Sequence, residues 1–379
     1  MEAKVLPGRG KARTGRFESE LQEKFEPMGL RLNIIAAAAT PCRDQLEAYA
    51  AEFPVWDPML THDGENWFLY LLSTTETSNR DNFFTRDNLI RGFVSRDLDS
   101  WQDIGTVIPA GFYGKRICAG SLHHDNGRFY FFCSATMEQF SSELLDQRIF
   151  LATSTDGRKF EIEEGFSLEP DPALYGTKAW YPDSDRMMYA WRDPYVFRDP
   201  VSGKFYLFIC AGGDRWGAPP KIAVAEADSL AGPYRLLPAA AKSLLRGPNG
   251  ADSVPVREME RVQVSYRNGR YCMMFSVWEH FMDEAWKQSM IRRGGVLSGS
   301  ATVVLWSDSV TGPYRFDDSA TLIEKPPGAN LYGAMNVSSP DPARGDFVVG
   351  WYPENFKPEV SSGIRIDWEG QAFRVEPIK

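Results

Sequence analysis

The sequence Gly203-Lys204-Phe205-Tyr206-Leu207 joins a turn residue to a run of aromatic and aliphatic side chains. Glycine suits the turn that precedes a strand, and bulky aromatic and β-branched residues after a turn favour a strand. A glycine or asparagine followed by such a run recurs along the chain. The other copies lie at residues 66–70 (NWFLY), 127–131 (GRFYF), 269–273 (GRYCM) and, in the weakest form, 345–349 (GDFVV).

A second strand follows each of the first four copies, and a short closing phrase ends the unit. The second strands are expected at residues 90–96, 148–154, 221–227 and 301–308. Two of the closing phrases are nearly identical, namely 231–234 (AGPY) and 311–314 (TGPY). Units roughly 60–75 residues apart, each with room for about four short strands, are typical of propeller blades. The sequence therefore predicts an all-β, five-bladed β-propeller.

The propeller is expected to occupy residues 51–379 as a single domain. Residues 1–50 stand outside the repeat and are expected to form an N-terminal extension. Its basic first part is interpreted as a tail. The segment 43–51 is a candidate for a short helix, and the extension could cap the propeller or add a strand to its last blade.

Composition and charge exclude several classes of function. The net charge is −9 with a pI near 5.2, and no basic stripe dominates the chain, which argues against a nucleic-acid partner. No apolar run has the length of a transmembrane helix, so no membrane association is expected. The short apolar run 34–39 lies too far from the start for a signal peptide, which favours a cytoplasmic location. The sequence leaves the oligomeric state open.

The cysteine and histidine residues give no sign of a disulfide framework or a metal site. The five cysteines are odd in number and scattered, and four lie in or beside strand-like segments, as buried free thiols do. The four histidines do not form a ligand set. We therefore expect no cofactor and no metal.

Three acidic residues lie in short segments that precede the first aromatic strand of their units. Asp57 lies in 54–58 (PVWDP), Asp193 in 191–195 (WRDPY) and Glu260 in 258–262 (EMERV). These segments are expected to be the innermost strands, which line the centre of a propeller. Acids at matching positions of different blades then converge on one central active-site pocket. The second unit has 118–121 (CAGS) at the equivalent place and no acid.

Several carboxylates in one pocket suit acid–base chemistry, because repulsion and burial raise at least one pKa while a nucleophile must stay ionised. Asp followed by Pro is also a common turn element, and Asp171, Asp199 and Asp341 are assigned to turns on that ground. The common position of the other acids favours a functional site. Aromatic side chains would serve there as stacking surfaces for a sugar.

The neighbours of the acids are candidate substrate-binding residues. Arg192 and Arg261 would bind sugar hydroxyls or hold a carboxylate ionised, the alternative being ordinary surface ion pairs. Trp56 and Trp191 flank two of the acids, and they serve either as core packing or as a stacking wall.

At these residues the sequence resembles glycoside hydrolase family 68, the levansucrases and inulosucrases, within a clan of five-bladed propellers that also includes family 32. The resemblance covers roughly residues 53–355. The family's V-W-D motif matches Val55-Trp56-Asp57 and its R-D-P motif matches Arg192-Asp193-Pro194. Its D-E-I-E-R motif matches 257–261 (REMER). The resemblance implies that Asp57 is the nucleophile, Asp193 the transition-state stabiliser and Glu260 the acid/base.

The resemblance also implies roles for two further residues and a reaction. Glu258 becomes a substrate-binding neighbour, and Tyr332 matches a family tyrosine near the acid/base. The implied activity is that of a retaining furanosidase or fructosyltransferase, which acts on a β-fructofuranoside such as sucrose through a covalent furanosyl-enzyme intermediate and needs no metal. The implied partner is a small carbohydrate or furanoside.

The sequence departs from the family in two places. The S-G-S that supports the nucleophile appears here as 118–121 (CAGS), which leaves Ser121 as the candidate binding residue. The arginine that grips the leaving glucose has no clear equivalent near 276–278 (SVW). The furanosyl side of the site is therefore kept, and the leaving-group side is altered.

Three alternative functions stay open at this stage. One is transfer of a fructose-like furanosyl group to a small non-sugar acceptor in biosynthesis. The second is an inverting arabinanase or xylosidase like those of glycoside hydrolase family 43, against which the pair Glu260-Arg261 argues. The third is a non-catalytic sugar-binding propeller, which would be expected to have lost one of the acids.

Overall fold

The computed structural model describes residues 44–74, 87–137, 145–175, 188–212, 220–243, 256–292, 299–315, 331–338, 345–353, 357–359, 364–369 and 372–377. The chain divides into Met1–Ala39 and a compact unit, Thr40–Lys379, which contains all of these residues. The predicted short helix is confirmed as α2 (Asp44–Glu52). Leu46 and Ala50 of α2 pack against strands that follow it, so the helix belongs to the compact unit.

The compact unit consists almost entirely of antiparallel strands, which form five separate sheets. The first sheet contains β1 (Val55–His62), β2 (Trp67–Thr74), β3 (Asn88–Ser95) and β4 (Gln102–Ile108). The second contains β5 (Arg116–Asp125), β6 (Arg128–Thr136), β7 (Leu145–Ser154), β8 (Glu161–Ile162) and, paired with β7 in parallel, β9 (Met188–Tyr189). The third contains β10 (Trp191–Arg198), β11 (Phe205–Ala211), β12 (Lys221–Ala227) and β13 (Arg235–Lys242).

The fourth and fifth sheets come from the C-terminal part of the chain. The fourth contains β14 (Glu260–Arg267), β15 (Arg270–Trp278) and β16 (Ser300–Ser307). The fifth contains β17 (Tyr332–Ser338), β18 (Asp346–Tyr352), β19 (Lys357–Glu359), β20 (Ile364–Glu369) and β21 (Ala372–Pro377). Between β15 and β16 lie a short 3₁₀ helix, η3 (Glu279–Phe281), and α3 (Glu284–Arg292).

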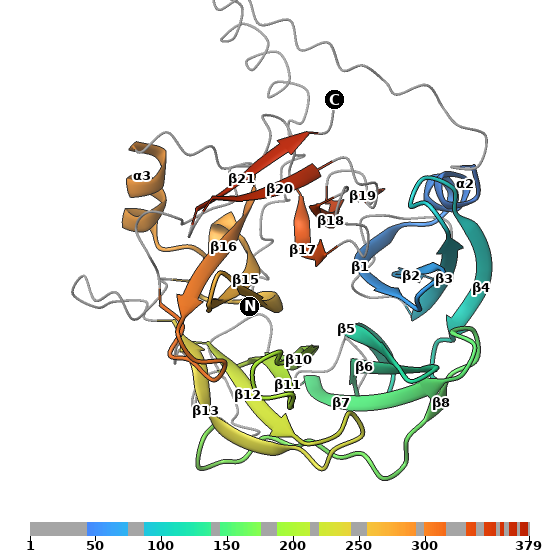
Figure 1. The fold of residues 1–379 in the computed structure, drawn as a ribbon, viewed down its shortest axis with the longest axis horizontal. Coiled ribbons are helices and arrows are strands. Elements are labelled where there is room, and N and C mark those ends of the chain that lie inside the picture. The colour runs from blue at the N-terminus through green and yellow to red at the C-terminus, as the bar shows by residue number, and fades with distance from the viewer. Residues whose placement is uncertain are drawn as a thin grey trace, which may run out of the picture. The chain divides into compact units, whose positions relative to one another are not determined.

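The five sheets close into a ring through their first strands (Figure 1). β1 contacts β5, β5 contacts β10, β10 contacts β14, β14 contacts β17, and β17 returns to β1. Each first strand is therefore the innermost strand of its sheet. The prediction of an all-β, five-bladed propeller is confirmed, and the aromatic phrases of the sequence form the second strand of each blade.

The core lies between neighbouring blades, whose sheets pack face to face. One cluster joins the first and second blades and includes Trp56, Tyr70 and Phe131. Similar clusters join the second blade to the third, the third to the fourth, and the fifth to the first together with α2. Aromatic and aliphatic side chains thus pack neighbouring blades against each other.

The described cysteines are free thiols and two of the Asp-Pro pairs lie in turns, as predicted. The thiols of Cys118, Cys133, Cys210 and Cys272 are free, and the last three are buried. Asp171 and Asp199 accept backbone hydrogen bonds from residues two or three positions further on, as turn residues do. Cys42 and Asp341 lie outside the described residues.

Candidate active site

Every innermost strand carries an irregularity near its start. The register shifts between residues 56 and 59 in β1, 117 and 120 in β5, 192 and 195 in β10, 260 and 263 in β14, and 332 and 335 in β17. Such a bulge bends the strand and redirects the side chain at that point. The five bulges lie at the same end of the five first strands, so they bring one position of each blade toward the centre of the ring.

The bulge residue has a left-handed backbone conformation in four blades. Its φ is 48° at Asp57, 52° at Asp193, 55° at Arg261 and 59° at Gly333. A non-glycine residue pays roughly 1–2 kcal/mol for this conformation, and such strain clusters at functional sites. Asp57 and Asp193 are therefore structurally equivalent, as the sequence predicted.

Glu260 does not share that position. In its blade the bulge residue is Arg261, and Glu260 lies one residue earlier, paired with Ser276. Its counterparts are Arg192, paired with Cys210, and Tyr332, paired with Trp351. The expectation that all three acids occupy matching positions is thus wrong by one residue for Glu260. Spacing along the chain could not reveal this, because the bulge is defined by pairing with the next strand.

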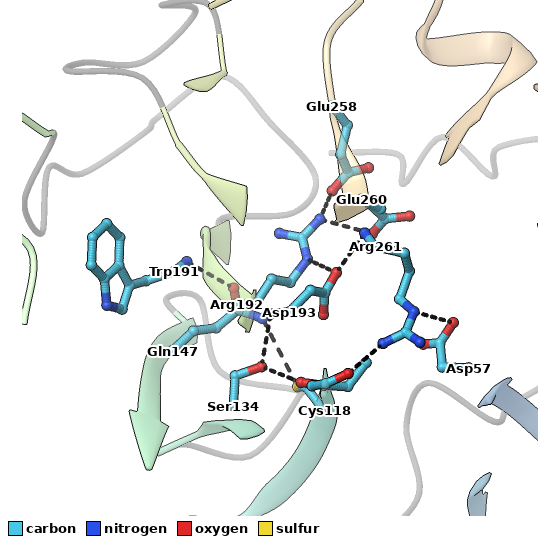
Figure 2. Close-up of polar contacts among 12 residues, drawn as sticks. Asp57, Cys118, Ser134, Gln147, Trp191, Arg192, Asp193, Glu258, Glu260 and Arg261 are labelled. Carbon is cyan, nitrogen blue, oxygen red and sulfur yellow. Dashed lines mark hydrogen bonds and ion pairs between the residues drawn. The ribbon is translucent and has the colours of Figure 1, made fainter. Parts of the chain in front are cut away.

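The three acids nevertheless lie around one centre, because two arginines connect them (Figure 2). Arg192 places Nη2 2.8 Å from Oε1 of Glu260 and Nε 3.8 Å from Oδ2 of Asp193. The backbone N–H of Arg261 donates to Oδ2 of Asp193 at 3.2 Å, and its Nε lies 3.7 Å from Oδ1 of Asp57. The first, third and fourth blades therefore each contribute one carboxylate.

Arg261 is buried and joins its own blade to the blades that carry the acids. Its side chain is only 4% exposed. Its guanidinium donates to the carbonyl of Gly120 at 3.0 Å and to the carbonyl of Pro58 at 2.6 Å, and it contacts the sulfur of Met335. With Asp193, these contacts reach all four other blades. This burial argues against the predicted contact with sugar hydroxyls and favours the other predicted role, that of holding a carboxylate ionised. The contacts with the other blades were not predicted.

Asp57 accepts a further hydrogen bond from the fifth blade. Trp351 of β18 donates its indole N–H to Oδ1 at 3.1 Å, and the side chain of Asp57 is 17% exposed. Burial raises the pKa of Asp57 to about 7, against the lowering effect of Arg261, and Asp193 and Glu260 raise it further. The residue that packs beside the carboxyl is Gly333. A Cβ there would lie 3.1 Å from Oδ1 of Asp57, so the absence of a side chain leaves room for the contact with Trp351.

Burial and like charges also shift the pKa values of the neighbouring acids. Burial raises the pKa of Asp193, opposed by Arg192. Burial, followed by the charge of Glu260, raises the pKa of Glu258 to about 7, although Arg192 also donates a short hydrogen bond to Glu258. Arg192 thus serves three carboxylates while its side chain is 5% exposed. Groups that share one cation in a buried site do not all ionise together.

Tyr332 positions the second oxygen of Glu260. Its hydroxyl donates a short hydrogen bond to Oε2, while Oε1 faces Arg192. Burial and the charges of Glu260 and Glu258 raise the pKa of Tyr332 well above its ordinary value, so the phenol stays protonated and remains a donor. The side chain of Glu260 is 19% exposed, which leaves it accessible to a ligand.

Three other predicted binding residues lie in the core. Trp191 is 1% exposed, and its indole N–H donates to the carbonyl of Leu168. Ser121 donates to the carbonyl of Pro194 and accepts from the N–H of Val196, so it holds β10 against β5. Trp56 is 3% exposed and packs in the cluster that contains Tyr332 and Trp351. These residues are buried and support the innermost strands, which corrects their assignment to direct substrate binding.

Sequence reasoning missed several residues that complete the site. Trp351 and Trp278 come from the second strands of the fifth and fourth blades, and Ser134 of β6 accepts the backbone N–H of Asp193 at 3.2 Å. Each lies at the end of a second strand, beside the start of an innermost strand. The sequence signal that could have found these residues is their place at the end of each predicted second strand, which pairs with the start of the innermost strand.

Comparison with known proteins identifies the fold. An inulosucrase from Halalkalicoccus jeotgali bound to kestose is 22% identical, with a TM-score of 0.62 over 86% of this chain and 88% of that one. The levansucrase of Bacillus subtilis is 15% identical, with a TM-score of 0.61 over 87% of each chain. The chain shares their propeller fold. A family 32 β-fructofuranosidase from Bombyx mori is 13% identical, with a TM-score of 0.60 over 89% of this chain and 69% of that one.

No family model and no curated protein matches the sequence. The likeness is therefore one of structure, and the residue-level resemblance rests on the short motifs around the acids. Within the described residues, no helix has the length and apolar character needed to cross a membrane, and no group of three or more His, Cys, Asp or Glu residues is arranged to hold a metal ion.

Proposed function

We propose that this protein is a retaining β-fructofuranosidase or fructosyltransferase that acts on a β-fructofuranoside such as sucrose. The observation that carries the proposal is the joint attachment of Asp57, Asp193 and Glu260 to two buried arginines at the centre of the propeller. The fold is shared with an inulosucrase bound to kestose and with a levansucrase complexed with sucrose, which supports a fructosyl donor.

In the first step, an oxygen of Asp57 attacks the anomeric carbon and the bond to the leaving oxygen breaks. Glu260 gives its proton to that oxygen, so the leaving group departs as a neutral alcohol. In the second step, water or an acceptor alcohol attacks the same carbon, its proton passes to Glu260, and the bond to Asp57 breaks. Two displacements at one carbon retain its configuration.

The remaining charged groups would bind the furanosyl ring. Asp193 accepts hydrogen bonds from ring hydroxyls and stabilises the positive charge that develops on the ring in the transition state. Nη1 of Arg192 is buried and has no hydrogen-bond partner among the described residues, so it is available to a hydroxyl of the substrate. Glu258, whose pKa lies near neutrality, is suited to exchange hydrogen bonds with another hydroxyl.

The experiment is incubation of the purified protein with sucrose and a panel of β-fructofuranosides, with products identified by mass spectrometry and their configuration by proton NMR. The first-formed product should retain the anomeric configuration. Glu260→Gln should lower kcat by about 10²–10⁴, the usual value of general acid–base help, and the loss should be smaller for donors with acidic leaving groups. Asp57→Asn should inactivate the enzyme toward every donor.

Asp308→Asn provides a matched control, since this carboxylate is 87% exposed and belongs to the same blade as Glu260. An inverted first product would rule out Asp57 as nucleophile. If Glu260→Gln weakened substrate binding and left kcat intact, Glu260 would be a binding residue and the non-catalytic alternative would gain support.

A further inference from the structure

We infer that Trp278 forms the binding surface for the leaving group and for the acceptor that replaces it, and that this group carries a planar aromatic or heteroaromatic ring. The inference rests on the furanosyl transfer proposed above and concerns the part of the site that would receive the leaving group.

Strand pairing places Trp278 at the end of the fourth blade where the acids lie. Glu260, the first residue of β14, pairs with Ser276 of β15. β15 continues for two residues beyond that pair and ends at Trp278, which pairs with Ser300. Trp278 therefore projects past the start of the innermost strand, at the end of the blade where the acids lie.

Trp278 is the outermost of three aromatic rings that contact one another. Its ring stacks on Tyr332 with centroids 4.1 Å apart and an interplanar angle of 18°, and it meets Trp351 edge-on at 6.4 Å. Tyr332 and Trp351 also meet edge-on, at 5.8 Å, and both are 3% exposed. Trp278 alone of the three is partly exposed.

This cluster touches both reacting carboxylates. Tyr332 donates to Glu260, and Trp351 donates to Asp57. The furanosyl ring must lie against Asp57 and Asp193, so the leaving oxygen must meet Glu260 from the other side. The residue that holds Oε2 of Glu260 is Tyr332, and Trp278 stacks on Tyr332. A group attached to the leaving oxygen therefore comes to rest against the open side of Trp278.

The chemistry of this surface favours a flat ring. Aromatic rings stack with an offset at centroid separations of about 4.5–7 Å, and a ring on Trp278 would extend the stack that Tyr332 begins. The exposed ring of His280, nearly parallel to Trp278 with centroids 6.4 Å apart, widens the aromatic surface.

The acidic residues around the platform disfavour an anionic group. Glu258 and Glu260 lie beside Tyr332, and Glu279 directly follows Trp278 in the chain. Arg192 already pairs with Glu258 and Glu260, so a phosphate or carboxylate on the leaving group would add negative charge to a cluster in which acids outnumber that cation. A neutral or cationic heteroaromatic ring is therefore the class of aglycone that this surface fits.

The test uses three donors whose leaving alcohols are close in acidity, namely methyl, cyclohexylmethyl and benzyl β-fructofuranosides. The values of kcat/KM then report contacts of the aglycone and not its ability to leave. The wild-type protein should prefer the benzyl over the methyl donor by roughly tenfold, which corresponds to one stacking contact. The cyclohexylmethyl donor should lie well below the benzyl donor.

Substitutions then assign the preference to one ring. Trp278→Leu should bring the benzyl-to-methyl ratio of kcat/KM close to one, because the benzyl donor loses more than the methyl donor does. Trp278→Phe should keep part of the ratio. Tyr266→Leu is the control, because Tyr266 lies toward the opposite end of β14 from Glu260 and contacts Tyr271. It should leave the ratio unchanged.

The outcomes separate the two proposals. Equal kcat/KM for all three donors in the wild-type protein, or a benzyl preference that survives Trp278→Leu, overturns the aromatic platform and leaves furanosyl transfer in place. A cyclohexylmethyl donor as good as the benzyl donor overturns the requirement for an aromatic ring. If no furanoside is cleaved, the proposed function fails and the platform falls with it.

Discussion

The indole N–H of Trp351 donates a hydrogen bond of 3.1 Å to Oδ1 of Asp57 and so joins the last blade of the ring to the first. The same indole meets Tyr332 edge-on, and Tyr332 donates to Glu260. Among its described residues, the fifth blade contributes no acid to these contacts, yet it orients the carboxyls of the proposed nucleophile and of the proposed acid/base.

Trp351→Phe tests this relationship, because it keeps an aromatic ring and removes the donor. A hydrogen bond to a charged group contributes about 1.5–3 kcal/mol, so kcat/KM at neutral pH should fall by roughly 10–100-fold. The hydrogen bond lowers the pKa of Asp57, and its loss should therefore move the acidic limb of the pH profile of kcat/KM to higher pH. A lower rate with an unmoved profile would mean that Trp351 acts only through packing.

The pH dependence of the wild-type enzyme should report Asp57 directly. Burial raises the pKa of this residue to about 7, and only the ionised carboxylate attacks the anomeric carbon. We therefore expect kcat/KM to fall below pH 7, toward a tenfold loss per pH unit. Initial rates at low substrate concentration between pH 5 and pH 9 provide the measurement. A profile that stays flat down to pH 5 would show that Asp57 is ionised in the free enzyme at that pH.

Asp57 should also destabilise the folded protein at neutral and alkaline pH. Its pKa rises from 3.8 to about 7 on folding, so between these values the folded state binds more protons than the unfolded state. The free energy of unfolding then decreases as the pH rises through this window. Asp57→Asn removes this contribution, and the variant should be more stable than the wild type at pH 8, by at least about 1 kcal/mol.

Urea unfolding at pH 5 and pH 8 measures the effect, with the exposed Asp308→Asn as the control that should change neither value. The stability gain of Asp57→Asn should be larger at pH 8 than at pH 5. An equal gain at both values would assign the effect to packing and not to ionisation.

Gly333→Ala should impair the site more than it impairs the fold. The added Cβ would lie 3.1 Å from Oδ1 of Asp57, in a backbone with φ of 59°. Gly203→Ala is a matched control, since its φ is 74° and no atom lies within 4 Å of the added Cβ. Both variants should lose about 1–2 kcal/mol of stability from the left-handed conformation, measured by denaturant unfolding.

Only Gly333→Ala should also lower kcat/KM, because it displaces the carboxyl of Asp57 from Trp351. Similar activity in the two variants, after correction for the folded fraction, would contradict the assignment of Gly333 to the site.

The blades and the acids could be predicted from local sequence. Aromatic strands after a turn, such as Phe205 to Leu207, form a repeat that is visible without pairing information, and they proved to be the second strand of each blade. The motifs around Asp57 and Asp193 lie in one segment each, so their equivalence was also accessible. By contrast, Trp56 and Trp191 were ambiguous, since an aromatic residue beside an acid fits a stacking wall and a core equally well.

The sequence by itself determined the number of blades, the innermost strands and which three acids the ring brings together, because a short local phrase marks each of them. Tertiary structure alone decided the offset of Glu260, the supporting role of Arg261 and the contact between Asp57 and Trp351, which lie 294 residues apart. A bulge is defined by the pairing of its strand with the next strand, so it cannot be found from one strand alone. The first and last blades become neighbours only when the ring closes. Period-two alternation along one strand carries neither piece of information.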